Sequence, residues 1–419
     1  MVLIRLIVVA AAMLGIVPCH GSVAPENPEL VTLVERVLAS HPSAAAARAE
    51  VEAARSELSG SRWAIFPTVA VESSADRRDG GDVAGVLSVE QPLWTGGRIR
   101  AGIRQSNHRV DAALARLDEV CLDLAQRTVQ AYVDVQRLRR RERILEASLS
   151  EHRKLVDSMH RRVQQQISPA SELELAQSRA RQTELEALQA QAEAEIALLR
   201  IRELTGDNTH QVAAQLNYHE EQLAASPAQL LKSAIDFDPS ARRLTAEAAV
   251  ASAEVSLRKS ELMPQLGVRY RHYLGTDSDR DDDLGLVFRV QADGGLSRIS
   301  AINAARQREQ AAALAVDAAT RERQQIVLAA LTDNGAARRR AQAGREAALA
   351  AKSVTDSFLR QFAAGRRTWP EVLNSVRETV SAELAQTDAE AGAVISYVRL
   401  LLLSGQWRPA DPQSDGNPR

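Results

Sequence analysis

The chain has 419 residues and a formal net charge of −2 at pH 7, a length that allows two or three ordinary domains. Only 3% of its residues are aromatic, whereas alanine, leucine, glutamate and arginine are abundant, which is typical of long helices and coiled coils. The nearly balanced charge gives no overall field that would favour nucleic acid as a partner.

Residues 1–24 are predicted to form a secretory signal peptide, because Arg5 precedes an apolar stretch that ends in small residues. The cleavage site stays open, and so does lipidation of Cys19, since Pro18 stands where a small residue is expected. Removal of this segment leaves Cys121 as the single cysteine, which excludes a disulfide within one chain.

The remaining chain is predicted to be a tandem duplication of a unit of about 200 residues. Residues 25–206 form the first repeat and residues 239–406 the second. Residues 207–238 are expected to be an irregular, equatorial connecting segment, and residues 407–419 a disordered tail. Four landmarks recur in order: Pro42-Ser43-Ala44 as Pro239-Ser240-Ala241, Pro67 as Pro264, Gly96-Gly97 as Gly294-Gly295, and Leu204-Thr205-Gly206 as Leu403-Ser404-Gly405.

Each repeat is predicted to begin with a helix, about Pro42 to Gly60 and Ser240 to Leu262, followed by two strands. Apolar and polar residues alternate in the strand segments, most clearly from Leu284 to Gln291. The mature chain has no apolar run of about 18 residues or more, so a membrane segment would have to be built from strands. The alternation fits transmembrane barrel strands; a hairpin with one face in water is the alternative.

Glycine pairs follow both strand pairs, at Gly96-Gly97 and at Gly294-Gly295. We expect them to make tight strand-to-helix transitions. A phosphate-binding loop is the weaker interpretation, because neither copy has the Gly-Lys-Ser/Thr ending.

Two very long helices are predicted to complete each repeat. The first outgoing helix has no glycine or proline from Ile103 to Ile167, which gives a rod of about 100 Å. The second runs from Ser297 to Ala364, and return helices follow at 170–205 and from Pro370. A coiled-coil seam is indicated by Val110, Leu114, Leu117, Cys121, Leu124, Thr128, Ala131, Val135 and Leu138.

The predicted fold class is therefore mainly α with a small β part: long antiparallel helical hairpins and four transmembrane strands per chain. Four strands cannot close a barrel, for which about eight are needed. A helical hairpin alone cannot bury its seam either. Both facts require oligomerisation, and three chains would form a twelve-stranded barrel above a tube of helix pairs.

Residues 91–100, Gln-Pro-Leu-Trp-Thr-Gly-Gly-Arg-Ile-Arg, resemble the strand-to-helix signature of TolC-like outer-membrane efflux proteins. Residues 365–374 resemble the periplasmic turn of the same family. The resemblance implies a homotrimeric channel in outer-membrane lipid, whose periplasmic tip opens when a periplasmic adaptor (membrane fusion protein) and an inner-membrane pump dock. No cofactor, metal site or nucleic acid is implied.

The resemblance also implies functional positions at the tip. Glu371 and Asn374 align with an acidic ring that constricts the pore and selects cations, so one acid is retained. Phe362 and Arg367 align with a latch onto Ser171 and Glu172, in which Arg367 and Glu172 could form a charge-assisted pair. The turns that would dock the adaptor or pump contain Gln165, Gln166, Ser168, Pro169, Gly365, Arg366 and Thr368.

Three functions follow, and none is enzymatic, because the eight histidines are scattered and form no metal-ligand or nucleophile motif. The first is passive export of small molecules or ions with an RND or ABC pump. The second is the outer channel of a type I protein secretion system, since residues 367–378 are similar to secretion-type members. The third is a periplasmic coiled-coil scaffold outside the membrane.

Overall fold

The computed structural model describes Pro25 and residues 27–75, 83–208, 225–275, 281–290 and 297–409. The predicted signal peptide, Cys19, the Gly294-Gly295 pair and residues 410–419 lie outside this part. The same holds for residues 209–224 of the predicted connecting segment and for most of the polar turns between paired strands.

The chain is mainly helical and carries one four-stranded antiparallel sheet, as predicted. The first half contains α1 (Pro28–Ser40), α2 (Pro42–Trp63), β1 (Thr68–Ala75), β2 (Val83–Trp94), α3 (Arg98–Gln164) and α4 (Ala170–Thr205). The second half contains α5 (Pro227–Phe237), α6 (Pro239–Ser260), β3 (Gln265–Gly275), β4 (Asp283–Arg289), α7 (Ser297–Ala363) and α8 (Trp369–Leu403).

Corresponding helices of the two halves have nearly the same length. Helices α2 and α6 both have 22 residues, α3 and α7 both have 67, and α4 and α8 have 36 and 35. Helices end in the same way as well, since Gly206 and Gly405 both adopt a φ of +67° after the last helical turn. The two halves are therefore built to one plan.

Helices α1 and α5 correct the sequence analysis, which missed α1 and predicted an irregular segment over residues 207–238. Both begin with proline at the first helical turn, after the capping residues Asn27 and Ser226. Proline is tolerated there, because the first amide groups of a helix have no partner within the helix. Residues 227–237 of the predicted connecting segment are therefore helical.

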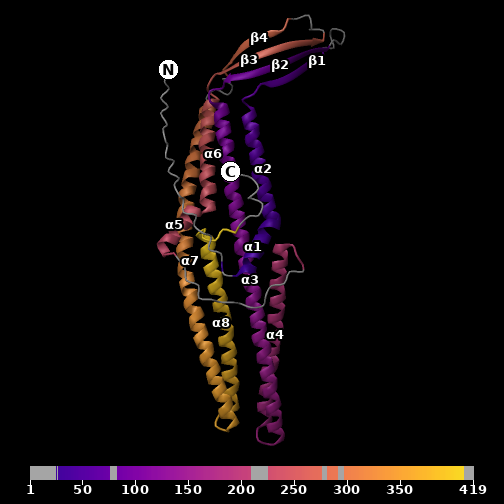
Figure 1. Cartoon of the computed structure of the whole chain (residues 1–419), viewed down its shortest axis with the longest axis vertical. Coiled ribbons are helices and arrows are strands. Elements are labelled where there is room, and N and C mark those ends of the chain that lie inside the picture. Colours follow the sequence, from indigo (N-terminus) through magenta and orange to yellow (C-terminus); the bar gives the residue numbers. More distant parts are fainter. Residues whose placement is uncertain are drawn as a thin grey trace, which may run out of the picture.

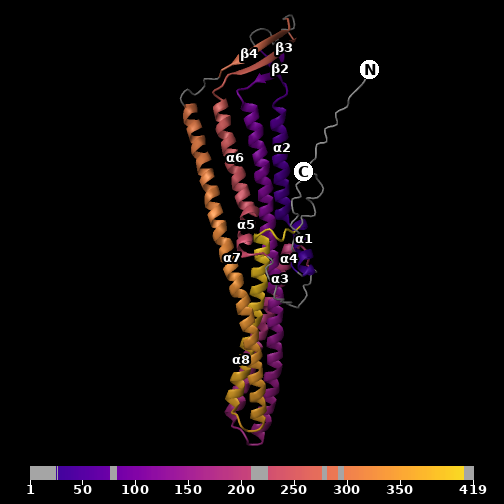
Figure 2. The same cartoon turned by 60° about the vertical axis from the view of Figure 1, so that its left-hand side comes forward.

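Helix α3 is a continuous rod of about 100 Å that changes partners halfway along its length (Figure 1). Its upper half packs against α2 and α6, and its lower half packs against α4 and α8 (Figure 2). Helix α7 behaves in the same way, with α6 above and α8 below. The predicted seam is buried from Leu124 to Leu138, but Leu114 in the upper half is 38% exposed.

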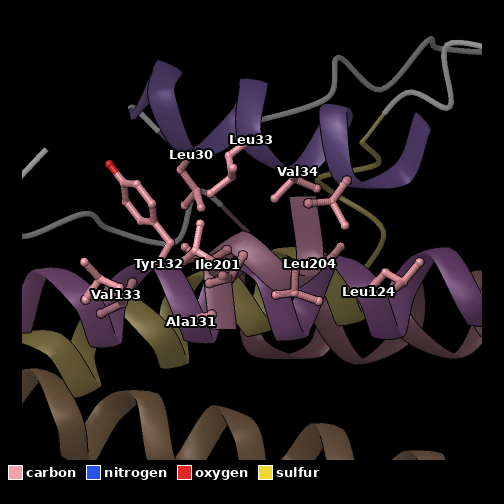
Figure 3. Packing of buried hydrophobic residues seen from close by; sticks show 14 of the residues in the cluster. Leu30, Leu33, Val34, Leu124, Ala131, Tyr132, Val133, Ile201 and Leu204 are labelled. Atoms are coloured by element: carbon pink, nitrogen blue, oxygen red, sulfur yellow. The ribbon is translucent and has the colours of Figure 1, made fainter. Parts of the chain in front are cut away.

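A compact apolar core lies where the partners change (Figure 3). Leucines and valines of α1, spaced three and four residues apart, pack onto Leu124 and Tyr132 of α3 and onto Ile201 of α4. The Tyr132 hydroxyl donates to Glu29 Oε2 at 2.9 Å and accepts from Asn27 Nδ2 at 3.1 Å. Burial raises the pKa of Tyr132, so the hydroxyl keeps the proton it donates.

Trp407 belongs to this core, which corrects the predicted start of the disordered tail at residue 407. Its indole is buried among the core side chains. Its backbone N–H donates to the carbonyl of Leu401 at 3.1 Å, and this bond turns the chain back at the end of α8. A large aromatic side chain that can be buried is a strong reason for the chain to stay ordered.

Below the core, charged side chains join α3 to the second helical hairpin, which is formed by α7 and α8. The side chain of Glu390 of α8 is only 4% exposed. Its Oε2 atom lies 2.6 Å from Nη1 of Arg140 of α3. Arg345 of α7 approaches its other carboxylate oxygen at 3.5 Å. Arg137 and Arg141 of α3 both pair with Asp388. A buried carboxylate is tolerated only with such partners, so these contacts fix the register between α3 and α8.

The sheet has the order β1-β2-β3-β4 and lies at one end of the helical rods. One face is apolar and exposed: Leu286 is 73% exposed, and Val69, Val71, Leu284 and Phe288 are similarly uncovered. The opposite face carries ion pairs, with Glu90 between Arg269 and Arg289. Among the described helices none is long and apolar enough to cross a bilayer.

The turn between β2 and α3 depends on two glycines with left-handed backbone conformation. Gly96 has a φ of +61° and Gly97 a φ of +90°, a region that glycine enters without steric cost. A Cβ atom added to Gly96 would lie 2.2 Å from Cβ of Met263, in the segment between α6 and β3. This contact brings the two halves together directly below the sheet.

We expect Gly96→Ala to destabilise the protein by about 2 kcal/mol or more, because it adds a clash to an unfavourable φ. Gly102→Ala is the matched control: it lies within α3 with open space around it, and it should stabilise by about 0.5 to 1 kcal/mol. Thermal unfolding of the purified protein in detergent measures both changes. Equal effects of the two variants would contradict the assigned turn.

Candidate functional site at the helical tip

The turns that join α3 to α4 and α7 to α8 lie at the end of the molecule opposite the sheet (Figures 1 and 2). They have the same hydrogen bonds. The N–H groups of Gln166 and Ile167 donate to the carbonyls of Val163 and Arg162 at 2.9 Å. In the second turn, the N–H groups of Gly365 and Arg366 donate to Phe362 and Gln361 at the same distance. Both helices thus end in a Schellman motif.

This motif requires a left-handed residue after the helix, and the two turns meet the requirement differently. Gly365 has a φ of +73°, whereas Gln166 occupies the equivalent position of the first turn with a φ of +58°. Gln165, Ser168 and Pro169 complete the first turn, and Thr368 completes the second. The first turn is therefore strained at a position where the second is relaxed.

An aromatic cluster packs the two hairpins against each other at the tip. Trp369 is 2% exposed, and its ring centroid lies 5.3 Å from that of Phe362. The guanidinium of Arg162, from the first hairpin, lies 4.7 Å from the centroid of the Phe362 ring. Met159 and Ala176 of the first hairpin are buried in the same cluster. Phe362, a predicted latch residue, contributes here through packing.

Arg367, the other predicted latch residue of the second hairpin, is held within its own turn. Its Nη1 atom lies 2.6 Å from Glu371 Oε1, and its Nε atom donates to Gln361 Oε1 at 3.2 Å. Its guanidinium also stacks on Phe358 at 4.2 Å. Ser171 and Glu172 lie in the first turn of α4. Within the described part of one chain Arg367 pairs with Glu371 and not with Glu172, so the latch stays a prediction.

Glu371, the predicted pore acid, caps the helix that it belongs to. Its Oε2 atom accepts from the backbone N–H and the hydroxyl of Thr368, both at 2.8 Å. These two bonds, and then Arg367, lower the pKa of Glu371 to about 2. Asn374 lies one turn further along α8 and is exposed. The single acid of the predicted ring is thus already engaged by donors of its own chain.

Three further arginines at the tip were not singled out from the sequence. Arg161 and Arg162 lie in the last turn of α3, and Arg360 lies in the last turn of α7. Cations are favoured there by the negative end of the helix dipole. The signal in the sequence was the occurrence of arginine at the end of both long rods. No group of three or more metal-ligating residues is found in the described ranges.

Comparison with known proteins agrees with this architecture. The outer-membrane channel OprN has the same fold, with a TM-score of 0.79 over 90% of both chains at 22% identity. The outer membrane protein VceC of Vibrio cholerae matches with a TM-score of 0.78 over 90% of this chain and 96% of its own, at 17% identity. The fold is therefore that of outer-membrane channel proteins.

The sequence is similar to outer membrane efflux proteins as well. Residues 33–207 match the family model described as outer membrane efflux protein. The outer membrane efflux protein BepC of Brucella suis biovar 1 (strain 1330) is 23% identical over 343 residues, which cover 80% of this chain and 74% of that protein. Both similarities are to outer membrane efflux proteins, and the family model covers the first half of this chain.

We expect Gln166→Gly to stabilise the first turn by about 1 kcal/mol, because glycine removes the cost of the left-handed conformation. The matched variant Gly365→Gln should destabilise the second turn by a similar amount. Hydrogen exchange of the amides of residues 163–167 and 362–366 measures the local opening of each turn. If the amides of the first turn exchanged faster in Gln166→Gly than in the wild type, the proposed strain at Gln166 would be contradicted.

The second turn should also loosen in acid. Because the folded pKa of Glu371 is lowered from 4.5 to about 2, its contribution to stability is present above pH 4.5 and is lost as the pH falls towards 2. Amide exchange at Thr368, corrected for its intrinsic pH dependence, should accelerate across this range. The Glu371→Gln variant is the control and should show no such acceleration; a similar response in both proteins would argue against the cap.

Proposed function

We propose that this chain is the outer-membrane channel of a tripartite export system and passively conducts small molecules or ions from the periplasm to the exterior. The observation that carries this function is the sheet with an exposed apolar face. Placed at the end of a bundle of about 100 Å, such a sheet suits lipid, while the helices extend into the periplasm. The function is transport and not catalysis.

The channel would be a homotrimer. Four strands are too few to close around a pore, whereas three chains supply twelve. The helices support the same conclusion, because α4 exposes large apolar side chains that nothing in the described part of the chain covers. They are Leu185, Leu188, Ile196 and Leu199. Helix α7 exposes a similar set, Leu314, Leu328 and Leu349. Neighbouring chains would bury both sets.

Partners would supply energy and specificity. A passive tunnel needs an inner-membrane pump, of the RND or ABC type, and a periplasmic adaptor that joins the two. The paired turns at the tip are the surface that such partners would contact. The matching lengths of the two halves support a tandem duplication, so that each chain presents two similar hairpins and the trimer six.

Matched substitutions on β4 test the membrane assignment. Leu286→Arg places a charge on the apolar face, where a charge near the bilayer midplane costs about 2 to 4 kcal/mol. We expect the variant to be lost from the outer-membrane fraction. It should also fail to restore resistance when it is expressed in an efflux-deficient strain. Val287→Arg, on the polar face of the same strand, should be tolerated.

A scaffold outside the membrane predicts a different result. Leu286 would then face water and accept arginine freely, and Leu286→Arg would behave like the parent protein. Normal outer-membrane levels of Leu286→Arg would therefore reject the channel.

A further inference from the structure

We propose that β4 of one chain pairs with β1 of the next copy of the chain, and that an ion pair between Arg289 and Glu72 of the partner subunit sets the register of this pairing. The inference rests on the proposed channel function. It assigns the surface through which the chains of the channel meet and the two residues that align it.

Strands β1 and β4 are the two edges of the sheet (Figure 1). β1 pairs with β2 and β4 pairs with β3, and neither has a second neighbour among the described strands. The backbone groups along an unpaired edge are a template for another strand. In lipid these groups must find partners, because no water can bind them. A second copy of this chain offers β1 to β4, and so leaves no edge open.

The helices below the sheet lack the corresponding contact. Helix α6 packs against both α3 and α7, whereas α2 packs against α3 and has no comparable contact with α7 in the described part of the chain. Ala246 and Ala253 of α6 are each 7% exposed. Their equivalents in α2, counted from the first proline of each helix, are Ala49 and Ser56, and both are exposed. A neighbouring chain would supply the missing contact between α2 and an α7.

The pairing of β2 with β3 shows how the two halves meet inside one chain. Glu90 of β2 lies opposite Arg269 of β3, and their side chains form an ion pair at 2.5 Å. The two hairpins have equivalent registers. Thr68, the first residue of β1, lies opposite Glu90, and Gln265, the first residue of β3, lies opposite Arg289. Arg289 therefore has the position in the second half that Glu90 has in the first.

The residue equivalent to Arg269 is Glu72, because each is the fifth residue of its strand. If the junction between chains repeats the junction within a chain, Arg289 lies opposite Glu72 of the partner subunit. The ion pair between Glu90 and Arg269 is then repeated with its charges exchanged. The two halves differ in sequence at these positions, yet both junctions bring opposite charges together.

The charges on the polar face of the sheet agree with this register. The strand residues of that face include three arginines and three acids: Arg269, Arg271, Arg289, Glu72, Glu90 and Asp283. Arg269 pairs with Glu90, and Arg271 pairs with Asp283. Arg289 only shares Glu90, at 3.5 Å, and Glu72 is exposed and has no ion pair among the described residues. The two charges that are left lie on the two edge strands and have opposite signs.

The apolar face agrees as well. In the same register Val290, directly after β4, lies opposite Val71 of the partner subunit, and these side chains are 57% and 66% exposed in one chain. A shift by one residue would bring apolar side chains to the polar face. A shift by two residues would keep the faces but place Arg289 opposite Ala70 or Ser74. The ion pair therefore distinguishes registers that the apolar pattern leaves open.

Disulfide cross-linking of the full-length protein in membranes tests the register. Cys121→Ala first removes the one cysteine outside the predicted signal peptide. Ser74→Cys combined with Val287→Cys then places two thiols opposite each other across the proposed junction, with Cα atoms about 5 Å apart. In one chain β1 and β4 are at opposite edges of the sheet, so oxidation by copper–phenanthroline should join different chains. We expect covalent trimers on non-reducing gels.

The matched control moves one thiol by two residues on the same face. Ser74→Cys combined with Gly285→Cys places the thiols diagonally, beyond the reach of a disulfide. A Cβ atom at Gly285 has open space around it, so the substitution fits the strand. The control should give about fivefold less covalent trimer than the directly opposite pair.

Charge variants test the ion pair itself. Glu72→Lys should lower the temperature at which the trimer dissociates in SDS by about 3 °C or more, because like charges would lie opposite each other. Arg289→Gln should lower this temperature in the parent protein, where it removes the pair. In the Glu72→Lys protein the same substitution should raise it, because it removes the repulsion. A change in the same direction in both proteins would show that the two residues do not meet.

The outcomes separate the inference from the function on which it rests. More covalent trimer from the control pair, or a trimer that neither thiol pair joins, would overturn the register and leave the channel function intact. A parent protein that is monomeric and absent from the outer membrane would reject the channel function itself.

Discussion

The structure depends on one constraint: a helix of 67 residues must be covered along its whole length. No single neighbour does this for α3, since α2 and α6 cover the upper half and α4 and α8 the lower half. Part of α3 would be exposed where α2 gives way to α4 as its neighbour. In the first half, α1 covers this part with a face rich in leucine and valine. The main core therefore lies where the partners change, because that is where helix ends would otherwise be exposed.

The second half solves the same problem with polar contacts. Arg323 of α7 takes the place that Leu124 has in α3, and it donates to the carbonyl of Leu403 at 2.9 Å. Its other nitrogen lies 3.5 Å from Asp238, the capping residue of α6. Asn334 donates to Ser396 at 3.1 Å. Polar contacts depend on direction more than apolar packing does, so these bonds add specificity to the apolar clusters between α7 and α8.

The sequence alone was sufficient to predict the helices and strands that have a local cause. A run without glycine or proline predicted α3, and alternation predicted the strands. Helices α1 and α5 were missed, although each has a proline in its first turn after a capping residue. The partner of Arg367 could not be predicted either: Glu371 at the third position of α8 competes with Glu172 for it. Sequence shows which charges are available, but the geometry of the cap decides which of them meet.

The distribution of charge along the proposed pore follows from these local choices. On the polar face of the sheet, Glu90 lies between Arg269 and Arg289, and Arg271 is paired with Asp283. The arginines of this face are therefore each paired with a carboxylate of the same sheet. At the tip the carboxylate of Glu371 caps α8 and pairs with Arg367 of the same turn. Helix capping thus keeps the one acid of the second turn in contact with donors of its own chain.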